Sequence, residues 1–147
     1  MNQSAAKPDG AKAQRRGLSG EEQAVFDVLL DLYACYLDND RDRLEAHLAD
    51  DCTLFDSSAP ELMSKAELQA ARRIAPIADA APVSRPVALD ASEPQVRVWD
   101  GWAVETHRLD ARFDDSTLDQ RLRCSSMLRW VAGRWLIVHH HEELLRD

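Results

Sequence analysis

The carboxylate Asp56 occupies the position in this sequence that most favours acid–base chemistry. It directly follows the apolar segment Cys52–Phe55 and precedes a turn-forming run that ends at Pro60. A carboxylate at the mouth of an apolar cavity acquires a raised pKa and can act as a general base. The same residues also make a good turn, in which an aspartate caps free N–H groups at a strand end. The residues alone leave both interpretations open.

His107 is the second candidate for proton transfer. It lies in an alternating segment, Ala103–Phe113, on the face that also carries Leu109 and Ala111. That apolar face predicts an inward-pointing side chain. His107 is therefore either an acid–base group in a cavity or a buried, hydrogen-bonded structural histidine.

Three consecutive histidines, residues 139–141, suggest a metal site at first sight. On a strand, however, neighbouring side chains point to opposite faces. Simple alternation places His139 and His141 on the face of Trp135 and Ile137, and His140 on the other. Two histidines would need a third ligand from another strand, such as His107 or Glu105, so we expect no metal. His139 and His141 either line a cavity, where they would bond a ligand or Asp56, or are hydrogen-bonded structural residues.

Composition describes one acidic domain. The chain has 147 residues and a formal net charge of −8, and its first 18 residues are basic, so the rest is more acidic still. Nucleic acids and anionic membranes bind proteins through clustered Lys and Arg side chains, and we therefore expect neither as a partner of this acidic domain. The sequence has no apolar run of membrane-spanning length and no apolar segment at its start that would predict a secretion signal. Three widely spaced cysteines predict reduced thiols in a cytoplasmic protein.

Helices are predicted in the first half of the chain. Residues 1–18 are expected to be a disordered arm, and a capping box at Ser19–Glu22 opens a helix that runs to about Asp38 and is apolar on most of its circumference. A short helix from Arg41 to about Leu48 and a strand, Cys52–Asp56, follow. A second capping box at Ser64–Glu67 opens a third helix, which must end before Pro76. The Pro- and Ala-rich connection after it, residues 75–94, includes one short edge strand near residues 87–89.

From Gln95 onward the hydrophobic period changes to two, which is typical of strands. Asp100-Gly101 and Ala132-Gly133 each separate two alternating runs, so two hairpins are predicted. Helices followed by a meander of antiparallel strands indicate a single α+β domain over residues 19–147. A curved sheet around an apolar helix would form a cone with an internal cavity.

The last hairpin resembles a known family. Residues 126–141 contain a Gly-x-Trp-x-Ile-Val-His run, which starts at Gly133, with a second histidine two residues later. This segment is similar to the closing hairpin of SnoaL-like proteins in the nuclear transport factor 2-like superfamily, and Ala49–Asp56 agrees with the front half. The resemblance covers about residues 20–145. It implies a cone-shaped α+β barrel, with three N-terminal helices packed against a curved antiparallel sheet, and a homodimer.

The same resemblance suggests site residues. In the related ketosteroid isomerases, the stretch similar to Ala49–Asp56 ends in the aspartate that moves a proton between carbons, and Asp56 falls on that position. The oxyanion-stabilising acid of those enzymes falls near Ser126, which is a weaker donor. Tyr33 and Tyr36 both lie near the position of a helix tyrosine, and each fits only with a one-residue shift. We therefore do not expect the complete steroid-isomerase apparatus.

Two functions remain open. The first is a cofactor-free isomerase or cyclase that acts on a small hydrophobic organic molecule, with Asp56 as general base and His107, His139 or His141 as its acid partner. The pocket would be lined by Tyr33, Tyr36, Phe55, Ser126, His139 and His141. The second is a non-catalytic ligand-binding or dimeric assembly module. Fold alone does not choose between them, because this fold serves many chemistries.

Overall fold

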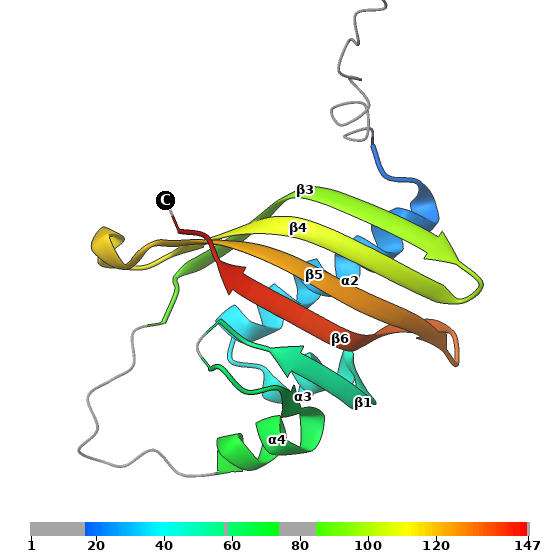
Figure 1. Cartoon of the computed structure of the whole chain (residues 1–147), viewed down its shortest axis with the longest axis horizontal. Coiled ribbons are helices and arrows are strands. Elements are labelled where there is room, and N and C mark those ends of the chain that lie inside the picture. Colours follow the sequence, from blue (N-terminus) through cyan, green and yellow to red (C-terminus); the bar gives the residue numbers. More distant parts are fainter. Residues whose placement is uncertain (1–16, 58, 74–84, 147) are drawn as a thin grey trace, which may run out of the picture.

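The computed structural model describes residues 17–57, 59–73 and 85–146. The predicted disordered arm, residues 1–18, lies outside these residues except for its last two positions. Part of the predicted Pro- and Ala-rich connection, residues 74–84, also lies outside them. The remaining chain forms a curved sheet with three helices in the described residues (Figure 1).

Helix α2, Gly20–Leu37, is the central element. The predicted capping box is confirmed: the Ser19 side chain accepts a hydrogen bond from the Glu22 backbone N–H, and the Glu22 side chain accepts one from the Ser19 backbone. The helix is buried along one side by Val25, Phe26, Leu29, Leu32, Tyr33 and Cys35. This side lies against the concave face of the sheet (Figure 1).

The elements after α2 form one end of the molecule. They are α3, Arg41–Ala46; β1, Leu48–Phe55; β2, Met63–Ser64; and α4, Lys65–Arg73. The second predicted capping box is also present, because the Ser64 hydroxyl accepts a hydrogen bond from the Glu67 N–H at 3.1 Å. Figure 1 shows α3 and α4 beside β1.

Two long hairpins make up the rest of the sheet. β3, Ala88–Trp99, joins β4, Trp102–Arg112; after the 3₁₀ turn η1, Ser116–Leu118, β5, Gln120–Val131, joins β6, Arg134–Leu144. Both predicted turns are confirmed, and both of their residues have positive φ: 44° and 80° at Asp100-Gly101, and 49° and 85° at Ala132-Gly133. The predicted edge strand at residues 87–89 is continuous with β3, across an irregularity between Ser92 and Gln95.

The predicted α+β cone is confirmed, with one difference in the sheet. The strand order is β2-β1-β6-β5-β4-β3, and every neighbouring pair is antiparallel except β1 and β6, which run parallel. The sheet is therefore mixed, and it does not close. A hairpin forces its two strands to be antiparallel, whereas β1 reaches β6 from a distant part of the chain and is free of that constraint.

β6 contains an extra residue that changes the direction of its side chains. Met127 of β5 pairs with His139, but the next residue, Leu128, pairs with Ile137, so Val138 has no partner on β5. A bulge of this kind shifts the inward–outward alternation of a strand by one position. Before the bulge Trp135 and Ile137 are buried, and after it His140 is.

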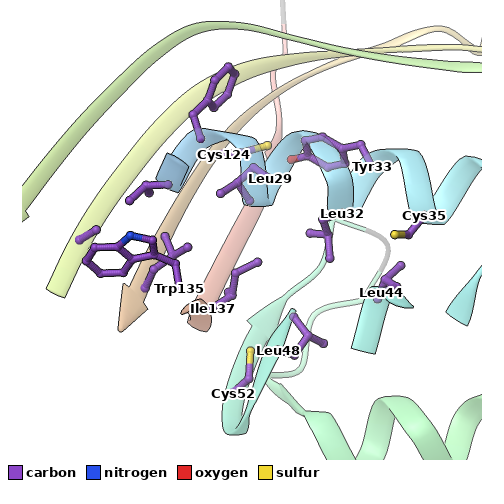
Figure 2. Close-up of a cluster of buried hydrophobic side chains, with 14 of the residues drawn as sticks. Leu29, Leu32, Tyr33, Cys35, Leu44, Leu48, Cys52, Cys124, Trp135 and Ile137 are labelled. Atoms are coloured by element: carbon purple, nitrogen blue, oxygen red, sulfur yellow. The ribbon is translucent and has the colours of Figure 1, made fainter. Parts of the chain in front are cut away.

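The core lies between α2 and the sheet (Figure 2). Leu29 of α2 and Ile137 of β6 are fully buried within it, and Leu44 and Leu48 extend it toward α3 and β1. The three cysteines are free and buried. One of them, Cys52, has its thiol pKa raised to about 12 by burial and by the charge of Asp51.

Asp31 ties α2 to α3. Its carboxylate accepts a hydrogen bond from His47 Nε2 at 2.6 Å and pairs with the guanidinium of Arg43, and the Cys35 thiol lies at 3.6 Å. The bond from His47, helped by the charge of Arg43, holds the pKa of Asp31 below its usual value. The folded state therefore binds this proton less tightly than the unfolded state does, and the gain in stability exists above the ordinary aspartate pKa.

We predict that Asp31→Asn removes part of the acid sensitivity of folding. As pH falls from about 5 to about 2, the wild type must protonate Asp31 and lose this contribution, whereas the variant has none to lose. At neutral pH the variant should be less stable by about 1 kcal/mol, since the pair is partly exposed. Urea unfolding at several pH values measures both effects. Asp27→Asn, four residues earlier on the same helix, is the control, and an equal pH dependence in both variants would contradict the assignment.

Candidate functional site

Two rows of polar side chains cross the concave face of the sheet beneath α2. In the first row Glu105, Ser126 and His140 lie opposite one another on β4, β5 and β6. In the second row the register aligns His107, Cys124 and Glu142. We call these six side chains, together with Tyr33 of α2, the polar band.

Apolar rows border the polar band on both sides. Ala103, Leu128 and Ile137 form the row on one side, and Leu109, Leu122 and Leu144 form the row on the other. All of these side chains except Leu144 are buried. The concave face is thus apolar except where the polar band crosses it.

The β4 side of the band is a chain of three hydrogen-bonded groups. The Tyr33 hydroxyl lies 2.7 Å from Nε2 of His107, and Nδ1 of His107 lies 2.7 Å from Oε1 of Glu105. In the tautomer that carries its proton on Nδ1, His107 donates to the Glu105 oxygen, and its Nε2 accepts the hydrogen bond that Tyr33 donates. In Figure 2 Tyr33 extends from α2 on the side where Cys124 lies.

Glu105 has one oxygen without a partner. The residue is 0% exposed, and its Oε2 makes no hydrogen bond with any described residue. A buried acceptor in this state destabilises a protein by about 1–3 kcal/mol. No donor or cation from the part of the chain that the structure describes reaches this oxygen.

The β6 side of the band is a second chain. Oγ of Ser126 lies 2.7 Å from Nδ1 of His140, and Nε2 of His140 lies 3.0 Å from Oε1 of Glu142. The Glu142 side chain is 21% exposed, so the polar band reaches the surface at this residue.

The electrostatics of the band favour a protonated Tyr33 and Cys124. Burial, followed by the charges of Cys124 and Glu142, raises the pKa of Tyr33 well above its usual value. Burial and the charge of Glu142 raise the pKa of the Cys124 thiol to about 12. Burial opposes ionisation of Glu142, but the hydrogen bond from His140 and the charges of His140 and His107 together hold its pKa below the usual value.

Three residues that the sequence indicated come together in this band: Tyr33, His107 and Ser126. Tyr36 does not join them, because it is 41% exposed and stacks under the guanidinium of Arg85 at 4.9 Å. Asp56 is exposed and follows the last residue of β1. Its backbone carbonyl accepts a hydrogen bond from the Ala59 N–H at 3.2 Å, so the chain turns directly after Asp56. Its role as a base stays a prediction.

The assignment of faces on the last strand is corrected by the structure. His139 and His141 do not share the face of Trp135 and Ile137, because the bulge at Val138 reverses the alternation between them. They lie on the outer face, where Nδ1 of His139 is 2.8 Å from the Thr53 hydroxyl. Phe55 lies beside them, with its ring 6.0 Å from that of His139 and 5.5 Å from that of His141.

Sequence reasoning missed His140 and Glu142 for the same reason. Without the bulge, both residues alternate outward, and nothing in the sequence marks Val138 as the extra residue. Glu105 could have been found, because it lies two residues before His107 on an alternating strand.

A hollow of about 510 Å³ lies along β3 to β6 and is lined by Glu93, Gln95, Thr106, His107, Arg108, Arg123, Cys124, Ser125, His141 and Glu143. Most of these residues belong to the outer face of the sheet, whereas His107 and Cys124 belong to the polar band on the concave face. The sequence analysis expects His141 inside the cone, whereas the structure places it in the lining of this hollow.

The chain matches the SnoaL-like domain family over residues 25–144. It belongs to that family. No curated protein matches it. None of the described helices is both long and apolar enough to cross a membrane.

Solved structures share the SnoaL-like fold with this chain. An NTF2-like protein from Cytophaga hutchinsonii has 21% identity and a TM-score of 0.68, and the match covers 87% of this chain and all of that one. A ketosteroid isomerase-like protein from Erwinia carotovora has 15% identity and a TM-score of 0.64, with 88% and 100% covered. The hub homology domain of CamKII from Chlamydomonas reinhardtii has 18% identity and a TM-score of 0.67, with 84% and 98% covered. At these identities the likeness shows the fold alone.

Proposed function

We propose that this SnoaL-like protein binds a small, largely hydrophobic organic molecule against the polar band and that His107 moves a proton on it. The setting is the cytoplasm, where the three free thiols stay reduced. The observation that carries this proposal is the fully buried Glu105, which holds His107 with one oxygen and has no partner among the described residues for the other.

The apolar rows on either side of the band favour a ligand with an apolar body and one polar group. Such a molecule would direct its polar group at the band, and its apolar body would have to displace the side chains that now bury Leu109 and Leu128. A hydroxyl or enolic group would supply the donor that Oε2 of Glu105 lacks. The partly exposed Glu142 is the point at which the band reaches solvent, and it is the natural entrance.

The hydrogen bonds also suggest the chemistry. Glu105 fixes Nδ1–H of His107, which leaves Nε2 as the basic nitrogen, and Tyr33 remains a protonated donor. A ketone that entered between these two groups would accept a hydrogen bond from Tyr33 at its carbonyl oxygen. Nε2 of His107 would remove a proton from the adjacent carbon and return it at the same or a neighbouring carbon. This transfer of one proton requires neither an oxidant nor a cofactor.

We predict that His107→Gln abolishes proton exchange on a ketone probe, whereas Asp56→Asn does not. Cyclic ketones of increasing size in D₂O are the probes, and NMR follows deuterium uptake at the carbon next to the carbonyl. Loss of a positioned base lowers such a rate by about 100-fold or more. Asp56 is exposed and His107 already has two partners in the band, so Asp56→Asn should leave the rate within about twofold.

His141→Gln is the matched histidine control, because His141 lies on the outer face. Loss of exchange in Asp56→Asn, with retention in His107→Gln, would transfer the role of base to Asp56. A probe that raises the melting temperature but exchanges no faster than in buffer would favour the non-catalytic alternative.

The alternative, a dimeric assembly module, is favoured by the outer face of the sheet. Trp99, which is 46% exposed, and Met127 lie there beside Trp102 and Val104. Exposed apolar groups of this size, next to a polar hollow, resemble the core and rim of an interface. A hub homology domain is among the proteins of similar fold. A second copy of the chain would cover this face in a homodimer.

We predict that the chain sediments as a dimer and that Met127→Glu converts it to a monomer, because a carboxylate would be buried in the apolar part of the interface. Met127 is 37% exposed, and Leu30 of α2 is 39% exposed, so Leu30→Glu is a control of nearly equal exposure on another surface. Sedimentation at several concentrations checks the prediction. A monomeric wild type, or dissociation in both variants, would contradict it.

A further inference from the structure

We propose that the polar band also binds a divalent transition metal of the zinc class, with Cys124, His140 and Glu142 as its ligands. The inference goes beyond the proposed function, because the metal would bind without any organic ligand.

The three side chains already converge. One donor atom from each, the Cys124 thiol sulfur, a His140 ring nitrogen and a Glu142 oxygen, lie within 4.8 Å of one another. Cys124 of β5 pairs directly with Glu142 of β6, and His140 lies two residues before Glu142 on the same face. The three ligands therefore lie on paired strands, which position side chains more rigidly than loops do.

The donors are those that zinc prefers: a sulfur, an imidazole nitrogen and a carboxylate oxygen, with one position left open. The second shell also fits. Metal-bound histidines usually bond a polar partner through the other ring nitrogen, and Nδ1 of His140 is held by the Ser126 hydroxyl at 2.7 Å. Nε2 is then directed at Glu142, 3.0 Å away, and the proton between these two atoms is what a metal ion would replace.

The charge of the band also favours a cation. The band contains two carboxylates, Glu105 and Glu142, and no Lys or Arg. Among the described residues the ion pairs of these carboxylates come from His107 and His140 alone. A buried carboxylate is strongly disfavoured without a cation or a proton nearby. A bound dication would supply that compensation.

A second cluster of the same residue types is less suitable. Asp31, Cys35 and His47 also lie within 4.8 Å of one another. There, however, Arg43 already pairs with Asp31 and places a positive charge at the carboxylate. The polar band is therefore the better metal site, and the three cysteines allow the two positions to be told apart.

Cobalt(II) titration of the full-length reduced protein, after removal of metals with EDTA, tests the proposal. Cobalt bound by a thiolate gives a charge-transfer band in the near ultraviolet. We expect one equivalent of cobalt to produce this band in the wild type, in Cys35→Ser and in Cys52→Ser, and Cys124→Ser to lose it. In a competition with zinc, Glu142→Gln should bind at least tenfold more weakly, since even second-shell changes reduce metal affinity by about 10–100-fold.

Cys124→Ser could lose the metal simply by failing to fold. Glu142→Gln provides a second test of the site, because the Glu142 side chain is partly exposed and its replacement disturbs the core less. If cobalt produces no charge-transfer absorption in the wild type, the proposal is overturned. Absorption that survives in Cys124→Ser would also overturn it. So would absorption that disappears only in Cys35→Ser, since that result would place the metal at the second cluster. Ketone exchange measured in EDTA reports on His107 separately, so failure of the metal site and failure of the proposed function are distinguishable.

Discussion

The extra residue at Val138 determines which side chains the last strand presents to helix α2. Before this bulge, Trp135 and Ile137 point inward and complete the apolar core. After it, His140 and Glu142 occupy the inward positions, and they pair with Ser126 and Cys124 on the neighbouring strand. The bulge is thus the boundary between a core and a polar site within one strand. Bulges that redirect a side chain are common next to functional sites.

The helix that covers this site contributes only one polar side chain to it, Tyr33. The polar groups of the sheet must therefore satisfy one another, and they do so in two chains, one on β4 and one on β6. Within residues 17–57, 59–73 and 85–146, this arrangement leaves Oε2 of the fully buried Glu105 unpaired. The β4 chain supplies a base held by a carboxylate, and the β6 chain supplies a set of metal ligands. Both proposals follow from the same constraint, which is that buried polar groups need partners.

The sequence predicted the fold well because its signals were local. The capping box at Ser19 and the two glycine-containing turns act over a few residues, and alternation on β4 correctly placed His107 inside. Two features could not be predicted, since each depends on contacts between distant segments. One is the parallel pairing of β1 with β6, and the other is the bulge, which moved His139 and His141 outward. The candidate site was therefore found in part, through Tyr33, His107 and Ser126.

Proton–proton nuclear Overhauser contacts of the three consecutive histidines test the central claim, that His140 and not its neighbours belongs to the polar band. We expect the ring protons of His140 to contact the β protons of Ser126, and the rings of His139 and His141 to contact Phe55, whose ring is 6.0 and 5.5 Å away from them. Contacts from His139 or His141 to Tyr33, with His140 contacting Phe55, would contradict the account.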